Sequence, residues 1–181
     1  MIKEQLTLWK IPLLIGNIAD VDNAQLVKTA LENQNRRLND DPTTSHYEDS
    51  EMPMSQHLET VFDTMTKEIT DVSGNQLMRK THWAHIQWHN QSCTLHSHPG
   101  YLVSAVYYPQ VPKDSNSPIV FQWDTGFGGH DRSWFLPNNG DYYAFPSHLQ
   151  HFVTRNESQS PRISISINFI EEEYQGPVGY V

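Results

Sequence analysis

The sequence has a single cysteine, Cys93, and few basic residues. One cysteine cannot form a disulfide within the chain, and it excludes a zinc site built from several thiolates. Lysine and arginine total 12 against 21 aspartates and glutamates, which gives a formal net charge of −9. Because no basic cluster interrupts this acidic background, we do not expect the protein to bind the phosphate backbone of nucleic acids.

Long apolar runs are also missing. No segment approaches the roughly 20 apolar residues of a membrane-spanning helix, and no basic segment followed by an apolar one opens the chain. We therefore expect a cytoplasmic protein without a membrane segment. The length of 181 residues suits a single domain, residues 1–181, with one main core.

The first 75 residues are expected to supply a strand and two supporting helices. Residues 6–15 are apolar but include Pro12, which suits an edge strand. Asp20 or Asp22 can cap a first helix that ends near residue 37.

A second helix is expected over residues 55–70, after a polar and acidic segment at 38–54 that predicts a surface loop. The second helix has an apolar stripe at helical spacing, which predicts packing on a sheet. The stripe consists of Leu58, Val61, Phe62, Met65 and Ile69.

From Gln76 onward, short segments with twofold alternation are separated by turn residues, which is typical of an antiparallel sandwich or barrel. The most regular segment is the last, where isoleucine and phenylalanine alternate with arginine, serine and asparagine. Its apolar face is expected in the core, and its polar face is either solvated or functional. Strands are expected near 79–89, 92–97, 102–109, 118–123, 141–145, 151–155 and 162–170.

Histidine is abundant, with ten residues in all, and eight of them lie between positions 82 and 151. Imidazole is the commonest metal ligand in proteins. His96 and His98 form a His-x-His pair, and on a strand both side chains would point to one face and reach one metal ion. His151 opens a later strand. Two ligands on one strand and a third on another would leave coordination positions open, which favours catalysis over a structural metal.

Arg162 and Ser164 lie on the same face of the last predicted strand. A guanidinium beside a hydroxyl can bind a carboxylate bidentately and fix its position. Cys93 is interpreted as a small buried apolar residue, since no base is paired with it.

Other histidines are weaker candidates. His85 and His89 share a strand face and could line the mouth of a barrel, whereas His148 is interpreted as a loop residue. The glycine-rich residues 126–132 predict a flexible loop that could close over a substrate.

Four segments resemble the iron(II)- and 2-oxoglutarate-dependent dioxygenases, and within them the group of 2OG-Fe(II) oxygenases of phages and marine bacteria that is related to prolyl 4-hydroxylases. They lie within residues 80–170 and are His-Ser-His-Pro-Gly at 96–100, Ser-Ala-Val-Tyr-Tyr at 104–108, residues 140–153, and Arg-Ile-Ser-Ile-Ser-Ile-Asn at 162–168.

The resemblance implies a mainly β (α+β) fold, a double-stranded β-helix (jelly roll, cupin-like) with N-terminal helices packed on one sheet. The catalytic core would be residues 76–172, with residues 1–75 supporting it and 173–181 as a tail. Of the site residues, His96 and His151 would bind Fe(II). Arg162, with Ser164 and Tyr108, would bind the distal carboxylate of 2-oxoglutarate.

The implied activity is O2-dependent hydroxylation of a C–H bond in a peptidyl or small-molecule substrate, with release of succinate and CO2. If a phage encodes the protein, its location would be the host cytoplasm. The expected assembly is a homodimer.

His98 departs from the usual pattern, since it stands where the superfamily has a carboxylate. It could be the third metal ligand, or it could lie outside the ligand set. A third interpretation shifts the register so that His98 is the first ligand and Gly100 takes the place of the acid. Replacing a carboxylate by an imidazole raises the charge of the iron site by one unit.

Two other functions remain open at this point. A cupin-like metal-binding protein or isomerase would use the same histidines without 2-oxoglutarate, and Arg162 would then form a structural ion pair. A non-enzymatic β-sandwich binding module would carry the histidines as surface residues.

Overall fold

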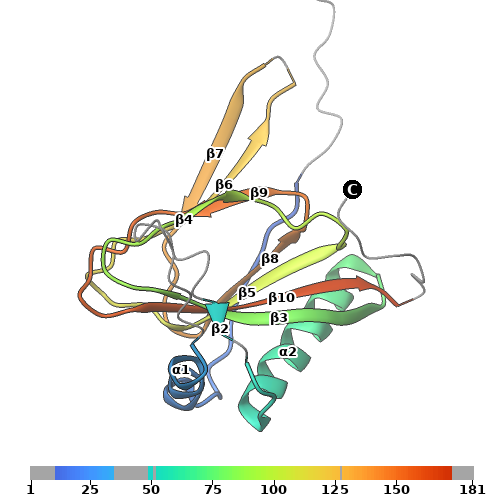
Figure 1. The fold of residues 1–181 in the computed structure, drawn as a ribbon. Helices are drawn as coiled ribbons and strands as arrows, with labels where there is room; N and C mark the ends of the chain where they lie inside the picture. Colours follow the sequence, from blue (N-terminus) through green and yellow to red (C-terminus); the bar gives the residue numbers. More distant parts are fainter. Residues whose placement is uncertain (1–10, 35–48, 51, 127, 173–181) are drawn as a thin grey trace, which may run out of the picture.

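Strands of two antiparallel sheets face each other in the computed structural model, which describes residues 11–34, 49–50, 52–126 and 128–172 (Figure 1). The larger sheet has the order β1-β8-β5-β10-β3-β2 and the smaller one β4-β9-β6-β7. The larger sheet contains β1 (Leu14–Asn17), β2 (Asp49–Ser50), β3 (Leu77–Gln87), β5 (Val103–Gln110), β8 (Asp141–Pro146) and β10 (Arg162–Glu171). The smaller sheet contains β4 (Cys93–His96), β6 (Ile119–Asp124), β7 (His130–Phe135) and β9 (Gln150–Val153).

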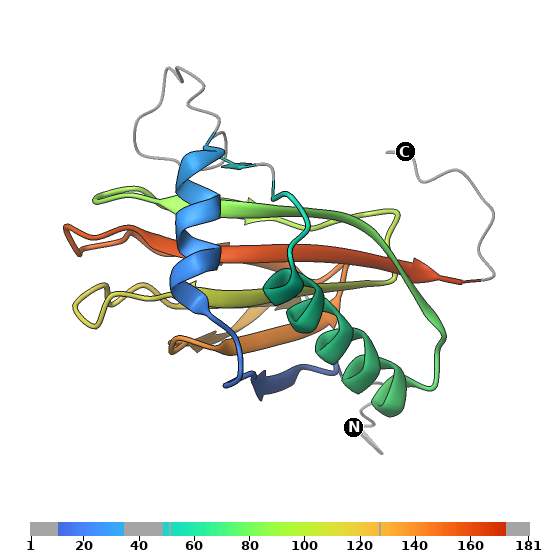
Figure 2. The ribbon, with the colours of Figure 1, turned by 90° about the horizontal axis from the view of Figure 1, so that it is seen from below.

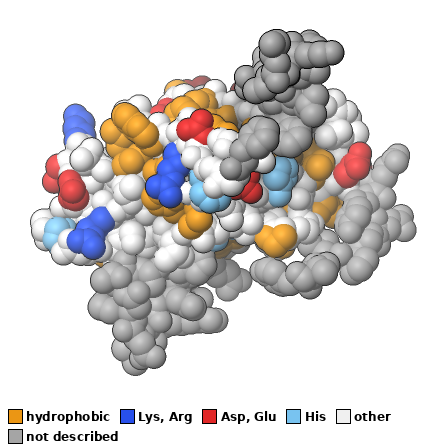
Figure 3. Space-filling view, turned by 90° about the horizontal axis from the view of Figure 1, so that it is seen from above, with side chains coloured by type: hydrophobic (Ala, Val, Ile, Leu, Met, Phe, Trp, Pro, Cys, Tyr) orange, Lys and Arg blue, Asp and Glu red, His pale blue; other side chains and the backbone are white. Residues whose placement is uncertain are grey.

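From β3 onward the chain crosses repeatedly between the two sheets, and the prediction of a mainly β, double-stranded β-helix is confirmed. The β6–β7 hairpin extends away from the sandwich (Figure 1). Figure 3 shows the face of the molecule that is seen from above. On its described part, charged side chains of both signs are scattered among hydrophobic ones. Trp134 on β7 is 66% exposed.

Helices α1 (Asn23–Glu32) and α2 (Gln56–Ser73) lie across the outer face of the larger sheet (Figure 2). Asp22 caps α1 by accepting a hydrogen bond from the Gln25 amide, as predicted. The α2 stripe is buried as predicted, because it packs on the sheet. Neither of these helices is both long enough and apolar enough to span a membrane.

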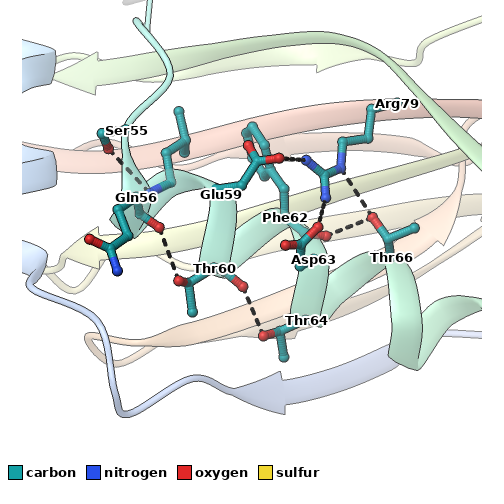
Figure 4. A network of polar contacts seen from close by, with 10 residues as sticks. Ser55, Gln56, Glu59, Thr60, Phe62, Asp63, Thr64, Thr66 and Arg79 are labelled. Atoms are coloured by element: carbon teal, nitrogen blue, oxygen red, sulfur yellow. Dashed lines mark hydrogen bonds and ion pairs between the residues drawn. The ribbon is translucent and has the colours of Figure 1, made fainter.

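Arg79 of β3 connects α2 to the larger sheet (Figure 4). Its guanidinium forms ion pairs with Glu59, at 3.1 Å, and with Asp63, and its Nε donates to Thr66 Oγ1 at 3.4 Å. The same group lies 5.6 Å from the centre of the Phe62 ring. These contacts hold the helix above the strand whose inner face lines the site.

Two sequence predictions are wrong in part. Residues 38–54 do not all form a surface loop, because β2 pairs with β3 and Met52 is only 2% exposed. Its carbonyl lies 2.9 Å from His82 Nε2. The glycine-rich segment is not simply a flexible loop, since β7 begins at His130 and pairs with β6. Period-two patterning is weak in β7 because it is an exposed edge strand.

Other boundaries fall partly on residues that the structure does not describe. The expected edge strand begins at Leu14 in the structure, and residues 6–10 lie outside the described part. Helix α1 ends at Glu32, whereas the predicted continuation at 35–37 also lies outside it.

Apolar side chains pack in two layers. One layer lies between the helices and the larger sheet, and the other lies between the two sheets, around Tyr108, Phe121 and Phe145. The polar cavity described below lies within this second layer.

Candidate metal centre

The polar face of β10 turns inward, toward the smaller sheet. Ser164, Ser166 and Asn168 line a cavity between the sheets, while the alternate residues Ile163 and Ile165 are buried against the helices. The solvated alternative for this face is therefore wrong. In the antiparallel pair with β3, residues directly opposite share a face, so β3 supplies Trp83 opposite Ser166 and His85 opposite Ser164.

Three histidines meet at this cavity. His96, His98 and His151 each offer a ring nitrogen, and these nitrogens all lie within 4.8 Å of one another. His96 of β4 is directly opposite His151 of β9, with ring centroids 4.3 Å apart. The His98 ring is 5.0 Å from that of His96 and 5.2 Å from that of His151. Three imidazoles on one side of a cavity can hold a metal ion and leave its other positions open.

Strand alternation is not what brings His96 and His98 together. Strand β4 ends at His96, and its register shifts between Cys93 and His96. His98 lies beyond the strand, where its amide donates to the Ser147 carbonyl at 2.8 Å. The expectation that both residues lie on one strand is thus wrong, although their rings do face each other.

Backbone contacts set the tautomers of two of these rings. The Nδ1 of His96 donates to the Thr94 carbonyl at 2.8 Å, and the Nδ1 of His151 donates to the Leu149 carbonyl at 2.9 Å. A proton on Nδ1 leaves the lone pair on Nε2, which is the arrangement of metal-binding histidines. Burial, and then the neighbouring His96, lower the pKa of His151 to about 3, so this ring is neutral at ordinary pH.

Arg162, the first residue of β10, is completely buried. Its guanidinium carbon lies 4.8 Å from the centre of the Tyr108 ring, and its Nη1 lies 3.5 Å from Gln87 Oε1. Among the described residues, its Nε and Nη2 have no hydrogen-bond partner. None of the ion pairs among the described residues includes it. A buried charge without a counter-ion is costly, so this arrangement fits an anionic ligand.

Tyr108 and Ser164 lie beside this guanidinium and line the cavity. The buried Tyr108 hydroxyl also has no hydrogen-bond partner in the part of the chain that the structure describes. Burial raises the pKa of Tyr108 to about 12, and the Arg162 charge partly offsets that effect. The neutral hydroxyl can therefore donate to a carboxylate bound at Arg162. These unpaired donors fit one end of a dicarboxylate such as 2-oxoglutarate.

The other predicted residues divide into two groups. His85 lines the cavity, and Cys93 is buried at its edge, with Sγ 3.8 Å from His96 Nδ1. His89 and His148 do not reach it: His89 lies in the turn after β3, where Nδ1 contacts the Glu157 carbonyl, and His148 lies in an exposed turn. His130 is exposed, and its Nδ1 lies 2.7 Å from the Asp124 carboxylate.

Sequence reasoning missed two residues. Gln87 lies beside Arg162, and the ring centroid of Tyr143 lies 5.7 Å from that of Tyr108. Alternation along β3 places Gln87 on the same face as His85, which was the available signal. Its partner could not be identified without the register of β3 on β10.

Two facing sheets bring three histidines to one cavity, and a buried arginine lies against Tyr108 of the cavity wall. This arrangement defines a jelly-roll protein with a candidate mononuclear metal site. Residues 81–168 match the model of the family described as "Putative 2OG-Fe(II) oxygenase". Over these residues the chain is similar to the 2OG-Fe(II) oxygenases, an enzyme family that uses a small-molecule cosubstrate. None of the curated proteins compared with the chain matches it.

Solved structures share the fold at low sequence identity. A prolyl hydroxylase from Trichoplax adhaerens, in complex with a hypoxia inducible factor peptide fragment, is 12% identical with a TM-score of 0.62, and the match covers 89% of this chain and 84% of that one. A 2OG-Fe(II) oxygenase family oxidoreductase from Burkholderia pseudomallei is 13% identical with a TM-score of 0.57, and the match covers 87% and 84%.

The epimerase SnoN, in complex with Fe3+, alpha ketoglutarate and nogalamycin RO, is 15% identical with a TM-score of 0.56, and the match covers 70% of this chain and 63% of SnoN. In another SnoN structure the chain spans 57% of that protein's length. At these identities the likeness concerns the fold.

Proposed function

We propose that the chain is an iron(II)- and 2-oxoglutarate-dependent oxygenase that hydroxylates a C–H bond of a peptidyl or small-molecule substrate. The observation that carries this proposal is a cavity with three converging imidazoles, whose wall residue Tyr108 contacts a buried guanidinium with two N–H groups unpaired among the described residues. The match of residues 81–168 to the family model and the fold of the neighbours support it.

In this proposal His96, His98 and His151 bind Fe(II). Once bound, iron and 2-oxoglutarate would use O2 to oxidise the substrate and release succinate and CO2. The Nε and Nη2 groups of Arg162 bind the distal carboxylate, with Tyr108 and Ser164 as further donors. The surrounding apolar residues exclude water from the cavity.

The neutral surroundings of the buried Arg162 charge favour 2-oxoglutarate over a cupin-like function without this cosubstrate. A structural role for Arg162 would require a carboxylate partner, and the described residues supply only the neutral Gln87 and the Tyr108 ring. The histidines do not form a dispersed surface set, because His151 is buried and the other two face it.

The test is to incubate the purified protein with Fe(II), 2-oxoglutarate and O2, and to measure succinate, with iron omitted in a parallel sample. Titration calorimetry with 2-oxoglutarate on protein loaded with Mn2+ adds a measurement that does not need the substrate. We expect iron-dependent succinate and saturable binding. Absence of both would reject the proposal.

A further inference from the structure

We propose that Gln87 is a positioning residue for Arg162: it holds the guanidinium so that the Nε–Nη2 edge remains available to a ligand, without neutralising its charge. This inference rests on the proposed role of Arg162 as the binding group for the distal carboxylate. Gln87 is the last residue of β3 and lies directly opposite Arg162, the first residue of β10. Both side chains are completely buried.

The Gln87 amide can adopt only one orientation. Its Nε2 lies 2.7 Å from the carbonyl oxygen of Gln91 and 2.6 Å from that of Thr154. Carbonyl oxygens accept hydrogen bonds but cannot donate them, so both hydrogens of the amide are used there. If the amide were flipped, Oε1 would lie against the carbonyl oxygens of Gln91 and Thr154, and no hydrogen would lie between these three acceptors. The Oε1 atom is therefore directed at Nη1 of Arg162, 3.5 Å away.

This contact decides which edge of the guanidinium is offered to a ligand. Gln87 approaches Nη1, and the Tyr108 ring lies 4.8 Å from the guanidinium carbon. The unpaired groups are Nε and Nη2, which together form the edge that binds a carboxylate through two parallel hydrogen bonds. The side chain is thus held at one end, and the edge suited to a carboxylate remains available.

The choice of an amide also matters for charge. A carboxylate at position 87 would pair with Arg162 and compete with an incoming anion, whereas the amide oxygen accepts a hydrogen bond and carries no net charge. Holding the guanidinium before the ligand arrives reduces the conformational entropy lost on binding. Gln87 should consequently increase affinity for ligands that have a distal carboxylate, and for those alone.

The experiment compares two ligands on Mn2+-loaded protein: 2-oxoglutarate, and 2-oxopentanoate, which lacks the distal carboxylate. In Gln87→Met, titration calorimetry should show about tenfold weaker binding of 2-oxoglutarate and unchanged binding of 2-oxopentanoate. If the methionine variant does not fold, Gln87→Asn keeps an amide but withdraws it from Arg162, and the same loss is expected.

Asn156→Ala is the matched control. Asn156 is equally buried and donates to the Gln87 main-chain carbonyl, at 2.9 Å, and to the Ser160 carbonyl, at 3.0 Å. Its loss should lower stability but leave the ratio of the two affinities as in the wild type.

Two results would overturn the inference: a wild-type ratio in a folded Gln87 variant, or an equal fall of the ratio in Asn156→Ala. The proposed function fails separately, if the wild type binds 2-oxoglutarate no more tightly than 2-oxopentanoate or binds neither.

Discussion

His96 and His151 lie directly opposite each other on β4 and β9, with their ring centroids 4.3 Å apart. Residues that are far apart in the sequence thus supply two of the three candidate metal ligands through a strand pair. Each ring is held by a hydrogen bond from Nδ1 to a carbonyl within its own segment. The position of His98 relative to this pair is the basis of the first prediction.

We predict that His98→Ala weakens binding of Mn2+ as strongly as His96→Ala does. The loss of affinity should exceed the roughly 10- to 100-fold that is typical for residues outside the ligand set. The reason is that its ring nitrogen lies within 4.8 Å of those of His96 and His151. Calorimetric titration of Mn2+ into the three proteins measures the effect. His85→Ala, which changes another histidine of the cavity, serves as control. A His98→Ala affinity close to that of the control would show that His98 is not a ligand.

Arg79→Ala should destabilise the protein without affecting binding in the cavity. Two ion pairs and the contact with Phe62 are lost, but all are partly exposed, with 27% of the Arg79 side chain accessible. We expect a loss of about 1 kcal/mol in the free energy of unfolding, or about 2–4 °C in Tm. Thermal denaturation measures it. The neighbouring exposed Lys80→Ala is the control and should change Tm by less. Equal effects in both variants would mean that the network in Figure 4 contributes nothing.

The regular parts of the fold follow from local patterns. The α2 stripe and the alternation of β10 identify the residues that pack between helices and sheet, because burial of one face imposes the period. Strand β7 was missed since both its faces are largely exposed, and Met52 was missed because a single apolar residue in a polar segment has no period. Local patterning cannot identify such positions.

The candidate site depends on contacts between distant segments. The motif at 96–98 points to a metal, but the rings converge through a register shift in β4 and a backbone hydrogen bond of His98 to Ser147, neither of which alternation predicts. Similarly, Arg162 could be identified as a candidate by its residue type. That Gln87 is its partner can be inferred only from the pairing of β3 with β10. Register between strands is a tertiary property, and it determines which polar residues meet.

Replacing Arg162 by methionine should raise stability and abolish tight binding of 2-oxoglutarate. The side chain is fully buried, and two of its N–H groups lack partners within residues 11–34, 49–50, 52–126 and 128–172. An apolar chain of similar length removes this uncompensated charge, and we expect a gain of at least about 1 kcal/mol in the free energy of unfolding without ligand. Binding of 2-oxoglutarate should weaken by at least about 100-fold, since its carboxylate loses a charged partner.

Thermal denaturation and calorimetry measure these two effects on the same Arg162→Met protein. The control is Arg155→Met on the exposed segment after β9, which should alter neither property much. Unchanged affinity in Arg162→Met would remove this residue from the binding site.

Metal and 2-oxoglutarate should each strengthen the binding of the other. Three neutral imidazoles leave the double positive charge of a metal ion uncompensated, and Arg162 adds a further buried charge beside the same cavity. A dianion compensates these charges, so we expect saturating 2-oxoglutarate to tighten Mn2+ binding by at least about tenfold. His98→Asp places a negative charge in the ligand set. In that variant Mn2+ should bind more tightly without 2-oxoglutarate, and the mutual effect should be smaller. Titrations of Mn2+ with and without 2-oxoglutarate measure both, and an Mn2+ affinity that 2-oxoglutarate leaves unchanged in the wild type would contradict the electrostatic argument.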